Sequence, residues 1–166
     1  MSRVKVAAVQ FEPTLFDKEC NISRLLEVCE QAAISGARLI VTPEMGTTGY
    51  CWFDRAEVAP DEPVPGPTTS RFAALAKHHG CHIVVGMPEV DDDGIYFNSA
   101  VLIGPDGIVG RHRNSHPYIS EPKWAHRSRW KRRLVDRWGL WGCTRGHRSC
   151  RRAVAPAWGR AGVRPA

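Results

Sequence analysis

Apolar and polar positions in the first part of the chain follow the periods of strands and helices in turn. Residues 4–11 are rich in β-branched and apolar side chains up to Pro13, which predicts a strand. Apolar residues then recur at the three- and four-residue spacing of an amphipathic helix. They are Ile22, Leu25, Leu26, Cys29 and Ala33. Gly36 can end this helix because glycine accepts a left-handed backbone conformation.

The same alternation continues to residue 113. An apolar run at 37–42 predicts a buried second strand, and a proline-rich connection at 60–67 precedes a second helix that Gly80 ends. That helix carries on one face Phe72, Leu75 and Ala76. Further strands are predicted at 81–86, 96–103 and 108–113, the last two joined by a turn at 105–107. The order β-α-β-α-β-β-β predicts an α/β fold, a layered sheet with a hairpin at its edge.

The loop after the second predicted strand holds the first candidate for chemistry. Ligand sites in open α/β sheets gather at the carboxyl ends of strands, where loops leave a rigid scaffold. Glu44 stands two residues after the apolar run that ends at Thr42. A carboxylate in this position is a candidate general base. The alternative is a structural carboxylate that caps the loop or pairs with an arginine.

Four segments of the chain, taken in order, resemble the nitrilase or carbon-nitrogen hydrolase superfamily. They are 4–10, 36–44 with 48–50, 98–100 and 104–107. The resemblance covers about residues 4–125 and implies a nitrilase-like αββα sandwich, here truncated to about its first half. It also implies a homodimer paired across the outer helices, and neither a metal nor an organic cofactor.

The family's chemistry uses a Glu, a Lys and a Cys. The Glu takes the thiol proton, the thiolate attacks a nitrile or amide carbon, and the Lys stabilises the developing charge. By this resemblance Glu44 is the general base. Asn114 stands where the family has its Lys, and an amide can donate a hydrogen bond but brings no positive charge. Lys123, past two prolines, is the alternative cation. Glu121 matches a second glutamate that orders the family's site, and its alternative is a carboxylate on a surface loop.

No cysteine in the sequence matches the family's nucleophile, which stands on a tight turn after a buried strand. Cys143 and Cys150 follow no β-branched run. Cys51, close in sequence to the candidate base, is interpreted as a small apolar residue of the pocket wall. Its neighbours Tyr50 and Trp52 are candidates for the lining of the substrate pocket. The resemblance predicts a hydrolase of a small nitrile, amide or carbamoyl compound, and the missing Lys and Cys predict that this chain is inactive.

Three histidines and a cysteine stand close together in the middle of the chain. They are His78, His79, Cys81 and His82. These are zinc-ligand types, but they cross from a helix end into a strand, so their side chains diverge, and the sequence offers no second ligand pair. A structural role is therefore favoured. We likewise expect His112 and His116 to be packed or solvated.

Composition changes abruptly near Ala125. Residues 1–125 carry a net charge of −5 and residues 126–166 one of +11, which together give the chain's +6. The second segment holds four of the six tryptophans and has no Ile, Phe, Tyr, Met, Asn, Gln or Glu. We therefore divide the chain into a partial hydrolase domain, 1–125, and an irregular Arg/Trp-rich tail, 126–166.

Two interpretations of the tail stand side by side. Arginines with interspersed tryptophans can neutralise phosphates and stack on bases, which makes a nucleic-acid-binding protein the alternative function. A high-GC gene read out of frame also yields Arg, Trp, Gly, Ala, Pro and Cys without periodicity. Because the tail begins in mid-domain without a linker, the frameshift interpretation is favoured.

Long apolar runs are missing from the sequence. No run approaches the roughly eighteen residues of a membrane helix, and the first residues lack the pattern of a signal peptide. The six cysteines contain no CxxC pair. We therefore expect a cytoplasmic protein with reduced thiols and no membrane partner.

Overall fold

A five-stranded mixed sheet with two helices forms the fold in the computed structural model, which describes residues 3–50, 57, 62–118 and 120–128. In chain order the elements are β1 (Val6–Ala8), α1 (Lys18–Ile34), β2 (Leu39–Val41), α2 (Pro67–His79), β3 (His82–Val90), β4 (Tyr96–Gly104), β5 (Gly107–Arg113) and the 3-10 turn η2 (Glu121–Lys123). This order confirms the predicted β-α-β-α-β-β-β pattern and the α/β class.

Three strands differ in length from the prediction: β1 and β2, predicted at 4–11 and 37–42, are shorter, and β3 is longer. The first strand spans three residues, Val6–Ala8, because it pairs only with the equally short β2. The third strand continues to Val90, four residues past the predicted end, because β4 pairs with it along this whole length. Pro88 is accommodated there because β2 pairs with β3 only as far as Val84, so among the described residues one side of β3 has no neighbouring strand at that point.

The strand directions bring distant parts of the sequence to one end of the sheet. Strands β1, β2 and β3 are parallel, whereas β4 and β5 are antiparallel additions on the other side of β3, in the order β1-β2-β3-β4-β5. The carboxyl ends of β2 and β3 therefore lie at the same end of the sheet as the start of β4 and the end of β5. The predicted edge hairpin is β4 and β5.

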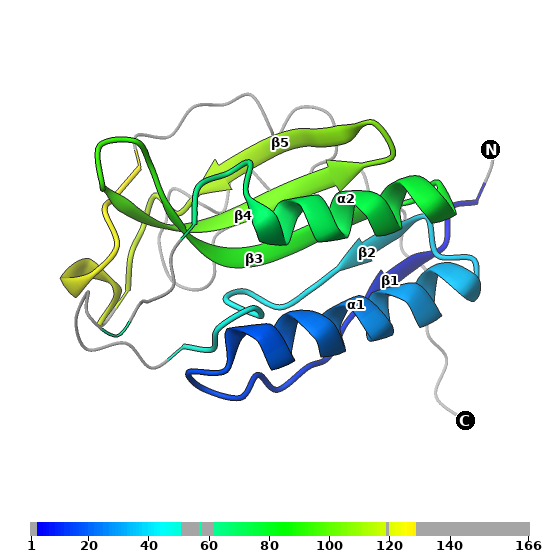
Figure 1. The fold of residues 1–166 in the computed structure, drawn as a ribbon, viewed down its shortest axis with the longest axis horizontal. Coiled ribbons are helices and arrows are strands. Elements are labelled where there is room, and N and C mark those ends of the chain that lie inside the picture. Colours follow the sequence, from blue (N-terminus) through cyan, green and yellow to red (C-terminus); the bar gives the residue numbers. More distant parts are fainter. Residues whose placement is uncertain (1–2, 51–56, 58–61, 119, 129–166) are drawn as a thin grey trace. The chain divides into compact units, whose positions relative to one another are not determined.

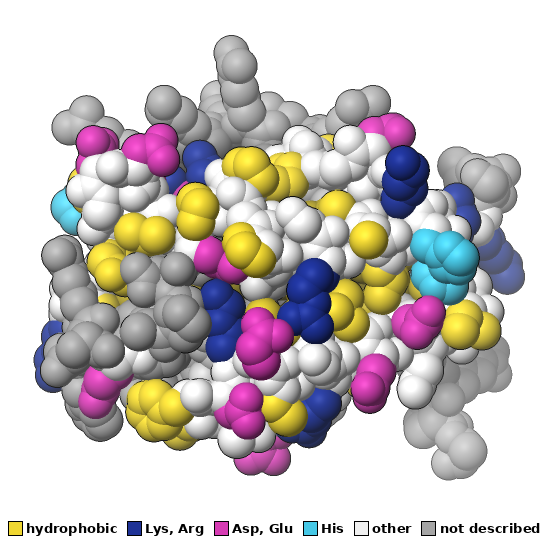
Figure 2. All heavy atoms as spheres, viewed as in Figure 1, with side chains coloured by type: hydrophobic (Ala, Val, Ile, Leu, Met, Phe, Trp, Pro, Cys, Tyr) yellow, Lys and Arg dark blue, Asp and Glu magenta, His cyan; other side chains and the backbone are white. Residues whose placement is uncertain are grey.

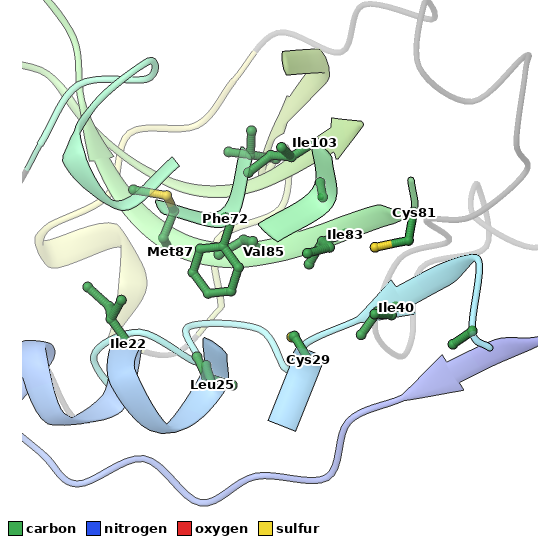
Figure 3. Packing of buried hydrophobic residues seen from close by; sticks show 13 residues of the cluster. Ile22, Leu25, Cys29, Ile40, Phe72, Cys81, Ile83, Val85, Met87 and Ile103 are labelled. Atoms are coloured by element: carbon green, nitrogen blue, oxygen red, sulfur yellow. The ribbon is translucent and has the colours of Figure 1, made fainter. Parts of the chain in front are cut away.

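Both helices cover the same face of the sheet, as Figure 1 shows. Alternate residues of the central strands point into this layer, among them Val85 and Met87 of β3 and Val101 of β4. Phe72 of α2 lies between these strands and Leu25 of α1 (Figure 3). The helix-facing residues of the strands and the apolar stripes of the two helices thus form the main core.

Residues that favour helix ends stand at the start of both helices and at the end of α2. Helix α1 starts after Asp17, whose carboxylate accepts a hydrogen bond from the backbone N–H of Cys20 at 3.1 Å. Helix α2 begins with Pro67 and ends at Gly80, which has the left-handed φ of 60° that the sequence predicts for this position.

The outer surface of the helical layer is mixed in charge. Figure 2 shows acidic and basic side chains interspersed over this face, with neither sign gathered into a patch. Within the described ranges, no helix is long and apolar enough to cross a membrane. The chain's excess of positive charge lies in residues 126–166, most of which are outside the described part of the chain.

Backbone hydrogen bonding to the sheet continues past Ala125. The N–H of His126 donates to the carbonyl of Tyr96 at 2.7 Å, and the N–H of Ser128 donates to the carbonyl of Asn114 at 3.1 Å. The first residues after the change in composition are thus joined to the fold. The rest of the predicted tail, from residue 129, lies outside the described residues.

Candidate active site

The loop that carries Glu44 is attached to β3 just beyond the end of β2. The N–H of Thr42 donates to the carbonyl of Val84 at 3.0 Å, and the Thr42 hydroxyl accepts from the N–H of Gly86 at 3.3 Å. The N–H of Thr47 donates to the carbonyl of Gly86 at 3.4 Å. Glu44 therefore stands at the carboxyl end of the parallel strands, where the sequence predicts it.

A tight turn follows Glu44 and is held by a buried side chain. Met45 has a left-handed φ of 52°, which costs a residue other than glycine on the order of 1 kcal/mol. Its side chain is fully buried and packs against Trp124 and Ala125. Its carbonyl accepts from the N–H of Gly49 at 2.7 Å. Burial of this side chain offsets the strain and anchors the turn that follows Glu44.

One amide joins Glu44 to a second carboxylate. Nδ2 of Asn98 donates to Oε1 of Glu44 at 2.8 Å and to Oε1 of Glu121 at 2.5 Å. Asn98 lies on β4, on the face opposite that of the core residue Val101, because side chains alternate along a strand. Residues from three separate parts of the sequence therefore meet at this end of the sheet.

Glu121 is an interior residue, and the alternative of a carboxylate on a surface loop is wrong. Its side chain belongs to η2 and is 1% exposed. Besides Asn98, its carboxylate accepts from the backbone N–H of Tyr118 at 2.8 Å and from Nδ2 of Asn114 at 3.4 Å to each oxygen. A buried carboxylate needs several hydrogen-bond donors, and the turn after β5 supplies them.

Asn114, which the sequence resemblance predicts at the position of the family's Lys, faces this cluster. It follows β5 directly, and its backbone N–H donates to the carbonyl of Asn98 at 2.7 Å. Its Oδ1 accepts from the N–H of His116 at 3.0 Å, which turns Nδ2 towards Glu121. Lys123, the alternative cation, is exposed on η2.

Tyr50 closes the cluster on the side of the loop. Its hydroxyl donates to Oε1 of Glu44 at 3.2 Å, and the residue is 42% exposed. Partial burial of the phenol, followed by the negative charges of Glu44 and Glu121, raises the pKa of Tyr50 well above its ordinary value. Tyr50 therefore remains a hydrogen-bond donor at neutral pH. Trp52, the other residue predicted to line the pocket, lies outside the described residues.

The described cysteines stand apart from this cluster. Cys29 and Cys81 are fully buried in the helix-facing core, and Cys20 is exposed on α1. Burial, with a smaller effect of Cys81, raises the pKa of Cys29 to about 12, so it stays a thiol. No described cysteine forms a hydrogen bond with Glu44 or its partners. The remaining cysteines, Cys51, Cys143 and Cys150, lie outside the described residues.

The histidines are packed in ordinary ways. Across the ranges that the structure describes, no three His, Cys, Asp or Glu side chains are arranged to hold a metal ion. The rings of His78 and His79 meet edge to face, with centroids 4.7 Å apart. Burial lowers the pKa of His112, and Nδ1 of His116 lies 2.9 Å from the Ser115 hydroxyl.

Sequence reasoning missed Asn98 as a member of the site. The available signal was a pair of polar residues, Asn98 and Ser99, inside an otherwise apolar strand. Each of them bonds a buried carboxylate on its own face of the sheet: Asn98 holds Glu121, and the Ser99 hydroxyl donates to Oε2 of Glu89 at 2.6 Å. Glu89 was also missed, because a single Glu in an apolar run indicates no partner.

Comparison with known proteins decides the family. The sequence model described as carbon-nitrogen hydrolase matches residues 5–163. The chain belongs to this family. The match continues past Ala125, where the composition of the sequence changes.

Curated members of the carbon-nitrogen hydrolase family are similar to this chain over most of its described length. A nitrilase of Pyrococcus abyssi is 38% identical over 120 residues, which cover 71% of this chain and 45% of the relative. An omega-amidase NIT2 of Xenopus tropicalis is 30% identical over 117 residues, covering 70% of this chain and 41% of the relative. The chain thus spans less than half the length of these relatives.

Solved structures of two amidases share the fold. A crystal structure of an N-terminal amidase superposes with a TM-score of 0.67 at 24% identity and covers 75% of this chain and 31% of its own. An amidase from Nesterenkonia sp. gives a TM-score of 0.62 at 18% identity, covering 76% of this chain and 49% of its own. The predicted nitrilase-like fold is confirmed. The described residues hold one helix-covered sheet of the predicted αββα sandwich.

Proposed function

We propose that this chain carries the general-base half of a carbon-nitrogen hydrolase site, with Glu44 as the base. The observation that carries the proposal is the bridge from Glu44 through Asn98 to Glu121, since it holds a carboxylate in one orientation at the carboxyl end of β2. A base must lie within a fraction of an ångström of its working position, and such a bridge supplies that precision.

The relatives support a proposal for the substrate class. Proteins similar to this chain include a nitrilase, an omega-amidase and a protein N-terminal amidase, all of which are named for action on nitriles or amides. We propose a small nitrile, amide or carbamoyl compound as the ligand of the site, with Tyr50 and Trp52 in its wall. In the mechanism that the resemblance implies, Glu44 takes the proton of a thiol and later assists water in cleaving the covalent intermediate.

We further propose that the chain by itself does not turn over such substrates. Asn114 stands at the Lys position and donates to Glu121, so it brings no positive charge to an oxyanion. Loss of one such stabilising group costs on the order of 3 kcal/mol, roughly a hundredfold in rate. Within the described residues, the two core cysteines are fully buried, and neither fits the role of nucleophile.

The test is ammonia release by the purified full chain. A panel of short aliphatic and aromatic nitriles and amides is incubated with the wild-type chain and with Glu44→Gln. We expect both to release ammonia at the rate of the buffer blank. Release by the wild-type chain that Glu44→Gln abolishes would overturn the proposed inactivity and support Glu44 as the base. Release that Glu44→Gln leaves unchanged would overturn the role of Glu44.

Two further roles stay as proposals. The family resemblance favours a homodimer, which sedimentation of the full chain would reveal. The charge of +11 in residues 126–166 favours nucleic-acid binding as the alternative function. Binding of DNA or RNA that weakens steeply with salt and disappears when residues 126–166 are deleted would support that alternative, and no binding at low salt would remove it.

A further inference from the structure

A single side-chain nitrogen stands between the two carboxylates of the site. Nδ2 of Asn98 lies 2.8 Å from Oε1 of Glu44 and 2.5 Å from Oε1 of Glu121. Carboxylate oxygens only accept hydrogen bonds, so only the NH2 end of the amide can join both groups. The two hydrogens on this nitrogen therefore serve two different carboxylates.

The backbone of Asn98 is held in place by the strands on both sides, which fixes the position of its side-chain amide. The residue is 4% exposed and lies in β4, between β3 and β5. It stands opposite Pro88 of β3, and its carbonyl accepts from the N–H of Asn114 at the end of β5. A short side chain on a strand that is paired on both sides has little freedom to move.

The other side-chain donors in the cluster hold the carboxylates less closely, and the backbone N–H of Tyr118, at 2.8 Å, reaches Glu121 alone. Nδ2 of Asn114 lies 3.4 Å from each oxygen of Glu121, near the limit of a hydrogen bond. Tyr50 reaches Glu44 at 3.2 Å from a partly exposed position. Asn98 is thus the one residue, among those described, that reaches both Glu44 and Glu121 through hydrogen bonds of 2.8 Å or less.

We propose that Asn98 is the positioning residue of the site, holding Glu44 and Glu121 together by one amide and leaving Oε2 of Glu44 to accept the proton. Oε1 of Glu44 is occupied by Asn98 and Tyr50, and no hydrogen bond among the described residues reaches Oε2. The catalytic meaning of this arrangement rests on the proposed function of Glu44 as a base. The bridge itself does not, and it can be tested without any turnover.

The experiment reads the Asn98 amide directly by NMR. The sequence has three asparagines, Asn21, Asn98 and Asn114, so the full chain labelled with 15N-asparagine gives at most three pairs of side-chain amide signals. Asn98→Ala assigns the pair of Asn98. We expect its two protons to lie downfield of an ordinary amide and to exchange slowly with water, since each is donated to a buried or partly buried carboxylate.

Two substitutions then separate the two bonds. Glu44→Gln replaces one charged acceptor and is expected to move one proton of the Asn98 pair upfield, while the other stays. Glu121→Gln is expected to move the other proton. Ser99→Ala is the matched control: it removes a hydrogen bond to the buried Glu89 from the next residue of the same strand, on the opposite face. It should leave the Asn98 pair unchanged.

The NMR experiment tests the Asn98 bridge independently of the ammonia-release assay. If Glu44→Gln and Glu121→Gln move different protons of the pair, the bridge is supported even in a chain that is inactive. If neither moves a proton, or if Ser99→Ala has the same effect, Asn98 does not position these carboxylates. That result would overturn the inference even if Glu44 proved essential for hydrolysis.

Discussion

Gly86 lies directly against the backbone of Glu44. A Cβ on Gly86 would stand 2.9 Å from Cα of Glu44 and 2.4 Å from the carbonyl oxygen of Pro43. Both neighbours are backbone atoms of the loop that carries the candidate base, so they cannot turn aside as a side chain would. The loop can approach β3 this closely only because position 86 has no side chain.

Gly86→Ala is therefore expected to displace the Glu44 loop and destabilise the fold by about 1–3 kcal/mol, as overpacking in an interior does. Gly104→Ala is the matched control on β4: its Cβ would meet side-chain atoms of His82 and Val109 at 3.0 Å, which can move. Urea denaturation measures both changes. An unfolding midpoint for Gly86→Ala equal to that of Gly104→Ala would contradict the close approach.

Glu89 forms a second buried carboxylate cluster, on the helix-facing side of the sheet. The residue is fully buried, and its Oε1 accepts from Arg111 at 2.6 Å and from Arg113 through both Nε and Nη2. The guanidinium of Arg113 also stacks on Phe97, 3.7 Å from the ring centroid. This cluster joins β3 to the edge strand β5.

Glu89→Gln is expected to destabilise the chain by about 2 kcal/mol, because it removes the buried carboxylate that both guanidinium groups contact, while Arg113 keeps its contact with Asp91 at 3.5 Å. Arg71→Gln is the control, since the ion pair of Arg71 with Glu19 is exposed and worth no more than about 1 kcal/mol. Thermal or urea unfolding compares the two. A loss for Glu89→Gln no larger than that for Arg71→Gln would show that the cluster adds nothing to stability.

His112 makes stability depend on pH. Burial lowers the pKa of His112 in the folded chain below the ordinary value of 6.5, so the unfolded chain binds the proton more readily. The contribution of neutral His112 is therefore fully present above pH 6.5 and is lost as the pH falls from there towards the lowered pKa. Unfolding midpoints between pH 8 and 5 should fall less in His112→Gln than in wild type, and equal slopes would remove His112 as the cause.

Residues 126–128 are expected to add to the stability of the fold. A chain that ends at Ser128 keeps the backbone hydrogen bonds from His126 to Tyr96 and from Ser128 to Asn114, whereas a chain that ends at Ala125 loses both. At about 1 kcal/mol for each bond, the shorter chain should be less stable by roughly 2 kcal/mol. Denaturation of the two truncated chains measures the difference, and equal midpoints would show that residues 126–128 add nothing to stability.

Much of the fold could be predicted from local pattern, because the features involved are local. Gly36 and Gly80 follow the helices at the positions expected, since glycine accepts the left-handed conformation at little cost. Strand lengths were less accurate. The end of β3 at Val90 depends on pairing with β4, and a strand's partner is not encoded in its own residues.

The residues of the candidate site were likewise predicted only in part from the sequence. The sequence by itself determined that Glu44 stands at the end of a buried strand and that the family is that of carbon-nitrogen hydrolases, and by resemblance it predicted Asn114 in the place of a lysine. Only the tertiary structure decided that Asn98 joins Glu44 to Glu121, and that Gly86 admits the loop. Periodicity reports which face a side chain takes, whereas contacts between residues far apart in sequence arise only when the strands pair.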